Sequence, residues 1–487
     1  MKKLLRLLIR ILLLVIVLIA GIVTIKTAGV SSRQTNIKTI PPPSVPSGAA
    51  ERLAQAIQLP TISAPEQFDA ETFLQLDTLI RKQYPLADSM LERINITPLS
   101  LTFKWPGKHP DLLPVLLLGH SDVVPVEKNT EKDWQADPFS GAIDNGFIWG
   151  RGSLDDKLTI FGILESIEQL LAEGYIPGRT IYLAFGHDEE TGGEKGARKM
   201  AEWFKRKNIQ FEFILDEGML IVEKAVAGLD APAAMIGVAE KGSVSLNLTA
   251  KMEQGGHSSM PPKATAIGVL SKAIVRLQET PFPAKIDGAT AAFFDYIAPE
   301  VSLPFKIALS NRWLTEALLI GQLSKESSPN ALLRTTTAPT RISGGIKDNV
   351  LPTTANATIN FRILPGETQA SVAEYVREVI NDPRIVVSVI SGNEPSVISD
   401  TESFGYQVIQ KSIQEIFAGV VVAPNLLVGF TDSRHYRELS DHIYRFLPVQ
   451  LTKDDLLRIH GKNERISIEN YHQTIRFYRQ LILNSGK

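Results

Sequence analysis

Four short polar clusters in the chain contain the residue types that bind metal ions or move protons. They read GHSDVVPV (119–126), GRGSLDDK (150–157), GHDEETGG (186–193) and LDEG (215–218). Three of them directly follow short apolar runs, so each is expected where a buried strand ends. Side chains at the carboxyl ends of neighbouring parallel strands meet at one edge of the sheet, where open α/β proteins place their chemistry.

Taken singly, each cluster has an ordinary structural explanation. A lone H-x-D is a weak signal, acidic residues before a helix often cap it, and a D-E-E run is typical of a solvated loop. Together, however, they would crowd several carboxylates into one site, which is costly unless cations neutralise them. Two divalent ions that share a bridging carboxylate would use this many ligands, more than one tetrahedral zinc needs.

The whole-chain composition narrows the class of protein. The 487 residues contain 51 Lys plus Arg against 53 Asp plus Glu, for a formal net charge of −2. Because electrostatic binding of nucleic acid requires a basic face, we expect no nucleic-acid partner. Cysteine is absent, which excludes disulfides and thiolate metal sites, so any metal must be bound by His, Asp and Glu.

The N-terminal segment predicts export. Lys2, Lys3, Arg6 and Arg10 precede the uncharged run Ile11–Ile25. This favours an uncleaved signal anchor in residues 1–30 that binds the membrane and leaves the rest translocated, since the basic end stays inside. A cleaved signal peptide, which would give a secreted or periplasmic protein, is the alternative. Residues 31–48 form a proline-rich tether.

The remaining chain predicts an α/β fold with an insertion. Apolar runs and amphipathic helical stretches alternate over 49–236 and return over 399–487, which indicates a catalytic domain with a mostly parallel sheet and helices on both faces. Residues 237–398 show two β-α-β halves with alternating strands, as expected for an inserted α+β, ferredoxin-like lid or dimerisation domain. Within it, 285–335 has no pattern that we can assign.

The ordered clusters, together with EKG…GGHSS and HGKNE, resemble the co-catalytic di-zinc amidohydrolases that include carboxypeptidase G, carboxypeptidase S and aminoacylase. The resemblance spans about residues 50 to 485. Three features resemble the branch of carboxypeptidase S and the secreted N-acyl-amino-acid hydrolases: the double Asp in GRGSLDDK, the phrase TDSRHY and the hydrophobic N-terminus. The resemblance implies two Zn²⁺ ions per chain, bridged by Asp155. His120 and Asp216 would complete the coordination of one ion, and Glu190 and His460 that of the other.

The resemblance also implies the other site residues. Glu189 would be the general base, and Asp122 would orient the imidazole of His120. His257 would stabilise the oxyanion and reach across a homodimer. Asn349 and Arg362 would hold the carboxylate of the substrate.

The expected function is that of a di-zinc metallo-carboxypeptidase or amidohydrolase, which cleaves the amide bond to an amino acid with a free carboxylate. Carboxypeptidase action on peptides and hydrolysis of N-acyl amino acids, including those with long acyl chains, use the same chemistry, and the sequence leaves both open. A catalytically inactive binding ectodomain and a single-metal protein are the competing classes. All five expected ligands and Glu189 are present, which argues against an inactive ectodomain.

Overall fold

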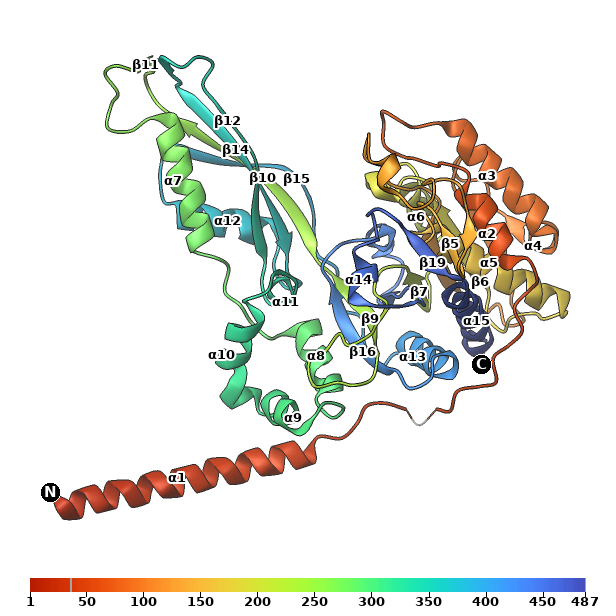
Figure 1. The fold of residues 1–487 in the computed structure, drawn as a ribbon, viewed down its shortest axis with the longest axis horizontal. Helices are drawn as coiled ribbons and strands as arrows, with labels where there is room; N and C mark the ends of the chain where they lie inside the picture. Colours follow the sequence, from red (N-terminus) through yellow and green to blue (C-terminus); the bar gives the residue numbers. More distant parts are fainter. Residues whose placement is uncertain (36, 487) are drawn as a thin grey trace.

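The computed structural model describes residues 1–35 and 37–486. Its main body is built on a ten-stranded mixed sheet (Figure 1). Four adjacent central strands run parallel, in the order β6 (Ile181–Gly186), β3 (Val115–His120), β7 (Phe213–Asp216) and β17 (Ile443–Arg445). The predicted α/β architecture with a mostly parallel central sheet is therefore confirmed.

Shorter strands extend the sheet on both sides. One edge is formed by β1 (Glu92–Arg93) and β2 (Leu101–Trp105). The other side contains β9 (Ala233–Glu240), β16 (Val421–Leu427), β8 (Ile221–Val222) and β18 (Gln450–Leu451). A separate small sheet joins β4 (Ile143–Asp144), β5 (Phe147–Trp149) and β19 (Arg465–Ser467).

Helices cover both faces of the sheet because successive side chains of a strand point to opposite faces. On β3, Leu117 belongs to the large core formed with α5 (Lys157–Ala172) and α15 (Ile468–Ser485), whereas Leu116 and Leu118 pack with α6 (Ala197–Arg206) on the other face. Further helices of the body are α2 (Ala49–Ile57), α3 (Ala70–Gln83), α4 (Pro85–Met90), α13 (Phe404–Ile416) and α14 (Lys453–Leu456).

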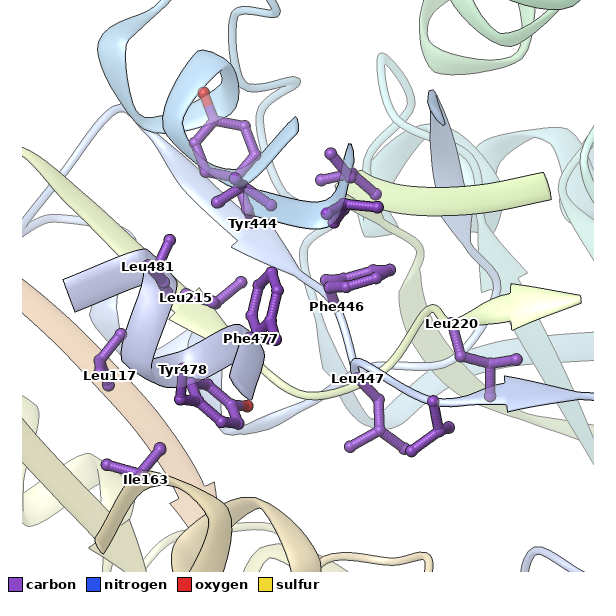
Figure 2. Close-up of a cluster of buried hydrophobic side chains, with 14 of the residues drawn as sticks. Leu117, Ile163, Leu215, Leu220, Tyr444, Phe446, Leu447, Phe477, Tyr478 and Leu481 are labelled. Carbon is purple, nitrogen blue, oxygen red and sulfur yellow. The ribbon is translucent and has the colours of Figure 1, made fainter. Parts of the chain in front are cut away.

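Aromatic packing fixes the C-terminal helix against the sheet (Figure 2). The Phe477 ring of α15 lies 5.4 Å from that of Phe446 and 5.3 Å from that of Tyr478. All three side chains are almost fully buried, and burial of each such ring stabilises the fold by about 1.5–3 kcal/mol. This packing brings the last helix, and the loop before it, to the edge where the central strands end.

The second part of the molecule is an arm that extends from the body (Figure 1). Its antiparallel sheet has the order β12 (Thr336–Gly344), β14 (Thr354–Ile363), β10 (Gly242–Lys251) and β15 (Ile385–Asn393), with α7 (Ala266–Glu279) and α12 (Gln369–Ile380) packed on it. This strand order is that of the ferredoxin-like topology. The alternating burial along β10 and β14 is the period-two pattern seen in the sequence.

The stretch that had no sequence pattern folds as four helices: α8 (Gly288–Ile297), α9 (Leu303–Ser310), α10 (Arg312–Leu323) and α11 (Ser327–Ala331). Helix α8 contacts β16 and belongs to the core of the main body. The range 237–398, expected as one insert, thus includes a helix that packs on the body, and the main sheet continues through β9 to Glu240. The N-terminal helix α1 spans Lys2–Gly29.

Candidate active site

The predicted site residues of the main body come together where the parallel strands end. His120 is the last residue of β3, and Glu189 and Glu190 lie on the short helix η2 (Glu189–Thr191) after β6. Asp155 precedes α5, and His460 follows α14. Because β6, β3 and β7 are neighbours in the sheet, the loops that leave them meet over one edge.

Asp155 lies between two histidines. Its Oδ1 is 2.9 Å from Nε2 of His120, and its Oδ2 is 2.9 Å from Nε2 of His460. Nε2 of His460 is also 3.1 Å from Oε1 of Glu190. Ligand atoms of His120, Asp155 and Glu190 all lie within 4.8 Å of one another. A carboxylate with each oxygen directed to a different imidazole is arranged as a bridging ligand would be.

Asp122 organises both halves of this cluster. Nδ1 of His120 lies 3.0 Å from the backbone oxygen of Asp122 and 3.3 Å from its Oδ1, which leaves Nε2 directed at Asp155. The same carboxylate accepts hydrogen bonds of 3.1 Å from the backbone N–H groups of Glu189 and Glu190. This is the supporting arrangement that a metal-binding imidazole requires.

A buried residue that sequence reasoning missed, Glu464, ties the loop of Asp155 to that of His460. Its Oε1 accepts hydrogen bonds of 2.9 Å from the N–H groups of Gly152 and Leu154. Its Oε2 pairs with Arg151, whose Nη2 donates to the backbone oxygen of His460 at 3.1 Å. Glu464 is the last residue of the HGKNE cluster, so its presence in that cluster was the available signal.

In the LDEG cluster, the two acidic residues have different surroundings. Oδ2 of Asp216 accepts a 2.8 Å hydrogen bond from the N–H of Ser433, and its Oδ1 accepts a 3.0 Å bond from the N–H of Glu217. Burial, followed by the carboxylates of Asp155 and others, raises the pKa of Glu217 well above its ordinary value. Asp155 is thus one of the charges that raise the pKa of Glu217, whereas both carboxylate oxygens of Asp216, the expected ligand, accept backbone hydrogen bonds.

The closely spaced acidic and histidine side chains of this cluster shift one another's pKa values. Burial raises the pKa of Glu189 well above its usual range, and neighbouring carboxylates add to this effect. Hydrogen bonds to Asp155 and Glu190 raise the pKa of His460 to about 10. At His120, burial acts to lower the pKa, but the Asp122 and Asp155 carboxylates outweigh it and raise this pKa well above the ordinary value. Such a cluster of imidazole nitrogens and buried carboxylate oxygens fits zinc.

Two of the three expected residues of the arm, His257 and Asn349, lie elsewhere. His257 ends β11 (Gly256–His257), which pairs with β13 (Val350–Leu351). The backbone oxygen of Asn349 accepts a 3.1 Å hydrogen bond from the N–H of Ser258. Figure 1 shows β11 at the far end of the arm from β6 and β7. The structure therefore places His257 and Asn349 beside each other and does not bring them to the Asp155 cluster.

Arg362 lies at the base of the arm, beside a second arginine. The Arg362 and Arg434 guanidinium groups lie 4.6 and 4.3 Å from the ring centre of Phe430. Nη2 of Arg434 donates a 2.7 Å hydrogen bond to the backbone oxygen of Gly192, in the loop after Glu190. Arg362 and Phe430 line a cavity of about 380 Å³ between the arm and the body. Sequence reasoning assigned no role to Arg434, although this residue lies in the TDSRHY phrase.

The two residues that precede Glu189 in the sequence have structural roles. The Asp188 carboxylate accepts hydrogen bonds from the N–H groups of Lys195 (2.7 Å) and Gly196 (2.8 Å), which closes the turn between Glu190 and α6. The His187 ring lies 2.7 Å from Oγ of Ser100 and packs edge-on to Phe73.

Most of the chain matches one known protein family. The profile of Peptidase family M20/M25/M40 matches residues 116–484. The chain belongs to this family. The family predicted from the sequence is thereby confirmed, and the chain is an enzyme of a metal-dependent hydrolase family of the carboxypeptidase kind.

Several relatives of this M20/M25/M40 chain are similar over most of their length. The Dictyostelium discoideum "Probable carboxypeptidase S-like 2" is 41% identical over 500 residues, which cover 100% of this chain and 95% of the relative. The human "N-fatty-acyl-amino acid synthase/hydrolase PM20D1" is 38% identical, over 89% of this chain and 87% of the relative. Carboxypeptidase S of Saccharomyces cerevisiae is 30% identical, over 91% of this chain and 85% of the relative.

Among solved structures, the M20 family metallo-carboxypeptidase Sso-CP2 from Sulfolobus solfataricus has the same fold. The TM-score is 0.64 at 19% identity, with 90% of this chain and 99% of that one covered. Human carnosine dipeptidase 1 gives a TM-score of 0.59 at 14% identity, with 91% and 100% covered. At these identities the likeness concerns the fold alone.

Proposed function

We propose that this protein is a di-zinc hydrolase that cleaves the amide bond to an amino acid with a free carboxylate. The observation that carries the proposal is the placement of Asp155, whose two oxygens face His120 and His460 at 2.9 Å each. That arrangement supports a bridging role for Asp155 between two ions.

His120, Asp155, Glu190 and His460 are the proposed ligands. For the fifth position we propose Glu217 in place of Asp216. Both Asp216 oxygens accept backbone hydrogen bonds, whereas the charge of Asp155 is felt at the Glu217 carboxyl group, where it adds to burial in raising the pKa. Zinc, when bound, would polarise the scissile carbonyl and make water a better nucleophile.

Glu189 is the proposed general base. It is held by the Asp122 carboxylate through its own N–H and adjoins the proposed ligand Glu190. Its pKa, raised by burial, suits a carboxyl group that accepts a proton from the attacking water and then donates it to the leaving nitrogen. Water thus adds its oxygen to the carbonyl carbon, the C–N bond breaks, and the amine leaves protonated.

The proposed substrate has two forms. Carboxypeptidase action on peptides is supported by the relatives named for carboxypeptidase S. Hydrolysis of N-acyl amino acids is the second candidate, supported by the 41% identity over 440 residues to the "N-fatty-acyl-amino acid synthase/hydrolase PM20D1" of Xenopus tropicalis. In both, Arg362 at the base of the arm would bind the free carboxylate, since its fork matches two oxygens.

The test uses the full chain in detergent, loaded with zinc, with a blocked dipeptide and a long-chain N-acyl amino acid offered side by side. We expect hydrolysis of at least one, and about 10²–10⁴-fold slower turnover in Glu189→Gln with unchanged zinc content. The control Glu202→Gln changes a half-buried acid on α6 that pairs with Arg198 and Lys199. Hydrolysis of neither substrate with two ions bound, or a fully active Glu189→Gln enzyme, would contradict the proposal.

We also propose that α1 is a signal anchor with the catalytic body exported. The described residues contain one helix long and apolar enough to span a membrane, Lys2–Gly29. A cleaved signal peptide is the alternative. A homodimer is the proposed assembly, because His257 lies too far along the arm to serve the Asp155 cluster of its own chain in this conformation.

A further inference from the structure

Helices α9 and α10 expose an apolar surface. Leu303, Phe305 and Ile307 of α9 are 64, 42 and 37% exposed, and Trp313, Leu314 and Leu318 of α10 are 49, 51 and 62% exposed. No residue of α10 is buried. A soluble surface tolerates single exposed apolar side chains, but a contiguous group of large ones marks a contact surface.

The exposed face of α10 is free of charge. Trp313, Leu314, Ala317, Leu318 and Gly321 fall on one side of the helix, at the spacing i, i+1, i+4, i+5, i+8. Glu316 lies on a different side by the same spacing, and Arg312 is paired at 2.7 Å with Asp295 of α8. This side of α10 is therefore apolar, and together with Leu303 and Ile307 of α9 it forms the surface that we call the α9–α10 face. Lys306 of α9 is the charged residue at its margin.

The α9–α10 face lies beside the end of α1 (Figure 1). Thr27 is buried there, and its Oγ1 accepts a 2.9 Å hydrogen bond from Nδ2 of Asn311, in the turn between α9 and α10. Nζ of Lys26 lies 5.7 Å from the ring centre of Trp313. Lysine and tryptophan at the end of an apolar helix are the usual residues of a membrane–water interface.

The α9–α10 face is fixed to the catalytic body. Helix α8, to which Arg312 is paired, contributes Phe293 and Ile297 to the body core, and Leu309 of α9 joins the same core. A contact made by α9 and α10 therefore orients the whole body. The segment after α1 is also bound to the body, since Nε2 of Gln34 donates a 2.8 Å hydrogen bond to the backbone oxygen of Val422.

The length of α1 indicates where the bilayer surface lies. The uncharged run Ile11–Ile25 spans about 22 Å as a helix, less than the roughly 30 Å of a typical hydrocarbon core. Lys26 must therefore stay at the outer interface, so the adjoining Trp313 is at the same depth. An apolar helical surface at that depth is placed as interfacial helices are in membranes.

We propose that the α9–α10 face docks into the outer membrane interface beside α1 and holds the catalytic body against the bilayer. The occupant is the headgroup–acyl boundary of the lipid. The proposal rests on the proposed role of α1 as an anchor, and it does not depend on which substrate the enzyme cleaves. A second copy of this chain on the same face is the competing occupant.

Because the chain has no cysteine, one introduced cysteine gives one labelled position. The test uses the full chain in phosphatidylcholine vesicles, with a fluorophore on Leu314→Cys or Leu318→Cys. Val17→Cys in α1 is the membrane reference. Ile176→Cys is the matched control, since Ile176 is as exposed as Leu314, at 51%, on the body. Quenching by nitroxide-labelled lipid is compared with quenching by aqueous iodide.

We expect lipid quenching at Leu314→Cys and Leu318→Cys to exceed that at Ile176→Cys by about twofold or more, with less iodide quenching. If Leu314→Cys and Leu318→Cys are quenched like Ile176→Cys while Val17→Cys is quenched by lipid, the α9–α10 face does not dock on the membrane. The proposal that α1 is an anchor would then remain. Protection from both quenchers would indicate a second copy and also overturn the proposal. If Val17→Cys is not quenched by lipid, the anchor fails too.

Discussion

At the scale of single residues, the acids of the site divide into those that bind backbone and those that face the cluster. Asp122, Asp188 and Asp216 each accept two backbone N–H groups. Their oxygens hold loops in place. Asp155 and Glu190 instead face imidazole nitrogens. Neighbouring acids in the sequence therefore have separate tasks, and each can be removed separately.

The pair Asp216 and Glu217 tests this division. Glu217→Gln should lose one of the two proposed zinc ions with little change in the free energy of unfolding. Asp216→Asn should keep both ions but unfold more easily by about 1–3 kcal/mol, because backbone donors lose a charged acceptor. Elemental analysis after gel filtration and denaturant unfolding measure the two quantities. Loss of an ion from Asp216→Asn alone would instead restore Asp216 as the ligand.

At the scale of elements, the junction (hereafter the hinge) where β9 of the body meets β10 of the arm contains a buried lysine. Lys241 lies between β9 and β10, and its Nζ donates hydrogen bonds of 2.9 and 2.8 Å to the backbone oxygens of Ala331 and Arg334. The hydrogen bond to Ala331 caps the C-terminal end of α11. Lys241 therefore joins the hinge to the helical segment that leads to α9 and α10, a role that its position in the sequence did not indicate.

Burial lowers the pKa of Lys241 to about 7. Between that value and the roughly 10.4 of an unfolded lysine, the unfolded chain binds the extra proton, so the contribution of Lys241 to stability rises with pH. Below about pH 7 the full cost of burying the charge remains. We expect the unfolding free energy of the wild type, relative to Lys241→Met, to rise by up to about 1.4 kcal/mol per pH unit above pH 7.

Denaturant unfolding of the detergent-solubilised chain at pH 7 and pH 9 measures this difference. Lys272→Met, which changes an exposed lysine on α7, is the control and should follow the wild type at both values. An equal difference between wild type and Lys241→Met at the two pH values would show that the amine is charged throughout.

At the scale of the whole molecule, the arm separates residues that one reaction is proposed to need. Arg362 lies at its base beside Arg434 and Phe430, whereas His257 and Asn349 lie at its tip (Figure 1). A second copy whose arm reaches over the Asp155 cluster would supply the missing imidazole, as a closed two-fold dimer allows.

Mixing two inactive variants tests this arrangement. In a heterodimer of His257→Ala with Glu189→Gln, one of the two sites would contain both native residues. We expect the mixture, after subunit exchange, to recover about a quarter of the wild-type activity. Each variant alone remains the control for residual turnover. No recovery, with heterodimers demonstrated by mass, would mean that His257 serves its own chain after the arm closes.

The sequence by itself determined the types of element, the polar clusters at strand ends and the family, because apolar periodicity and short motifs are local. It also predicted His120, Asp155, Glu190 and His460 as one group, which the fold brings together. Only the tertiary structure distinguished Glu217 from Asp216, since residues 431–433, distant in the chain, bind the Asp216 carboxylate. Likewise, only the structure showed that 285–335 folds as helices and that their apolar face adjoins the end of α1. Contacts between segments that are distant in the chain cannot be predicted from local residue spacing.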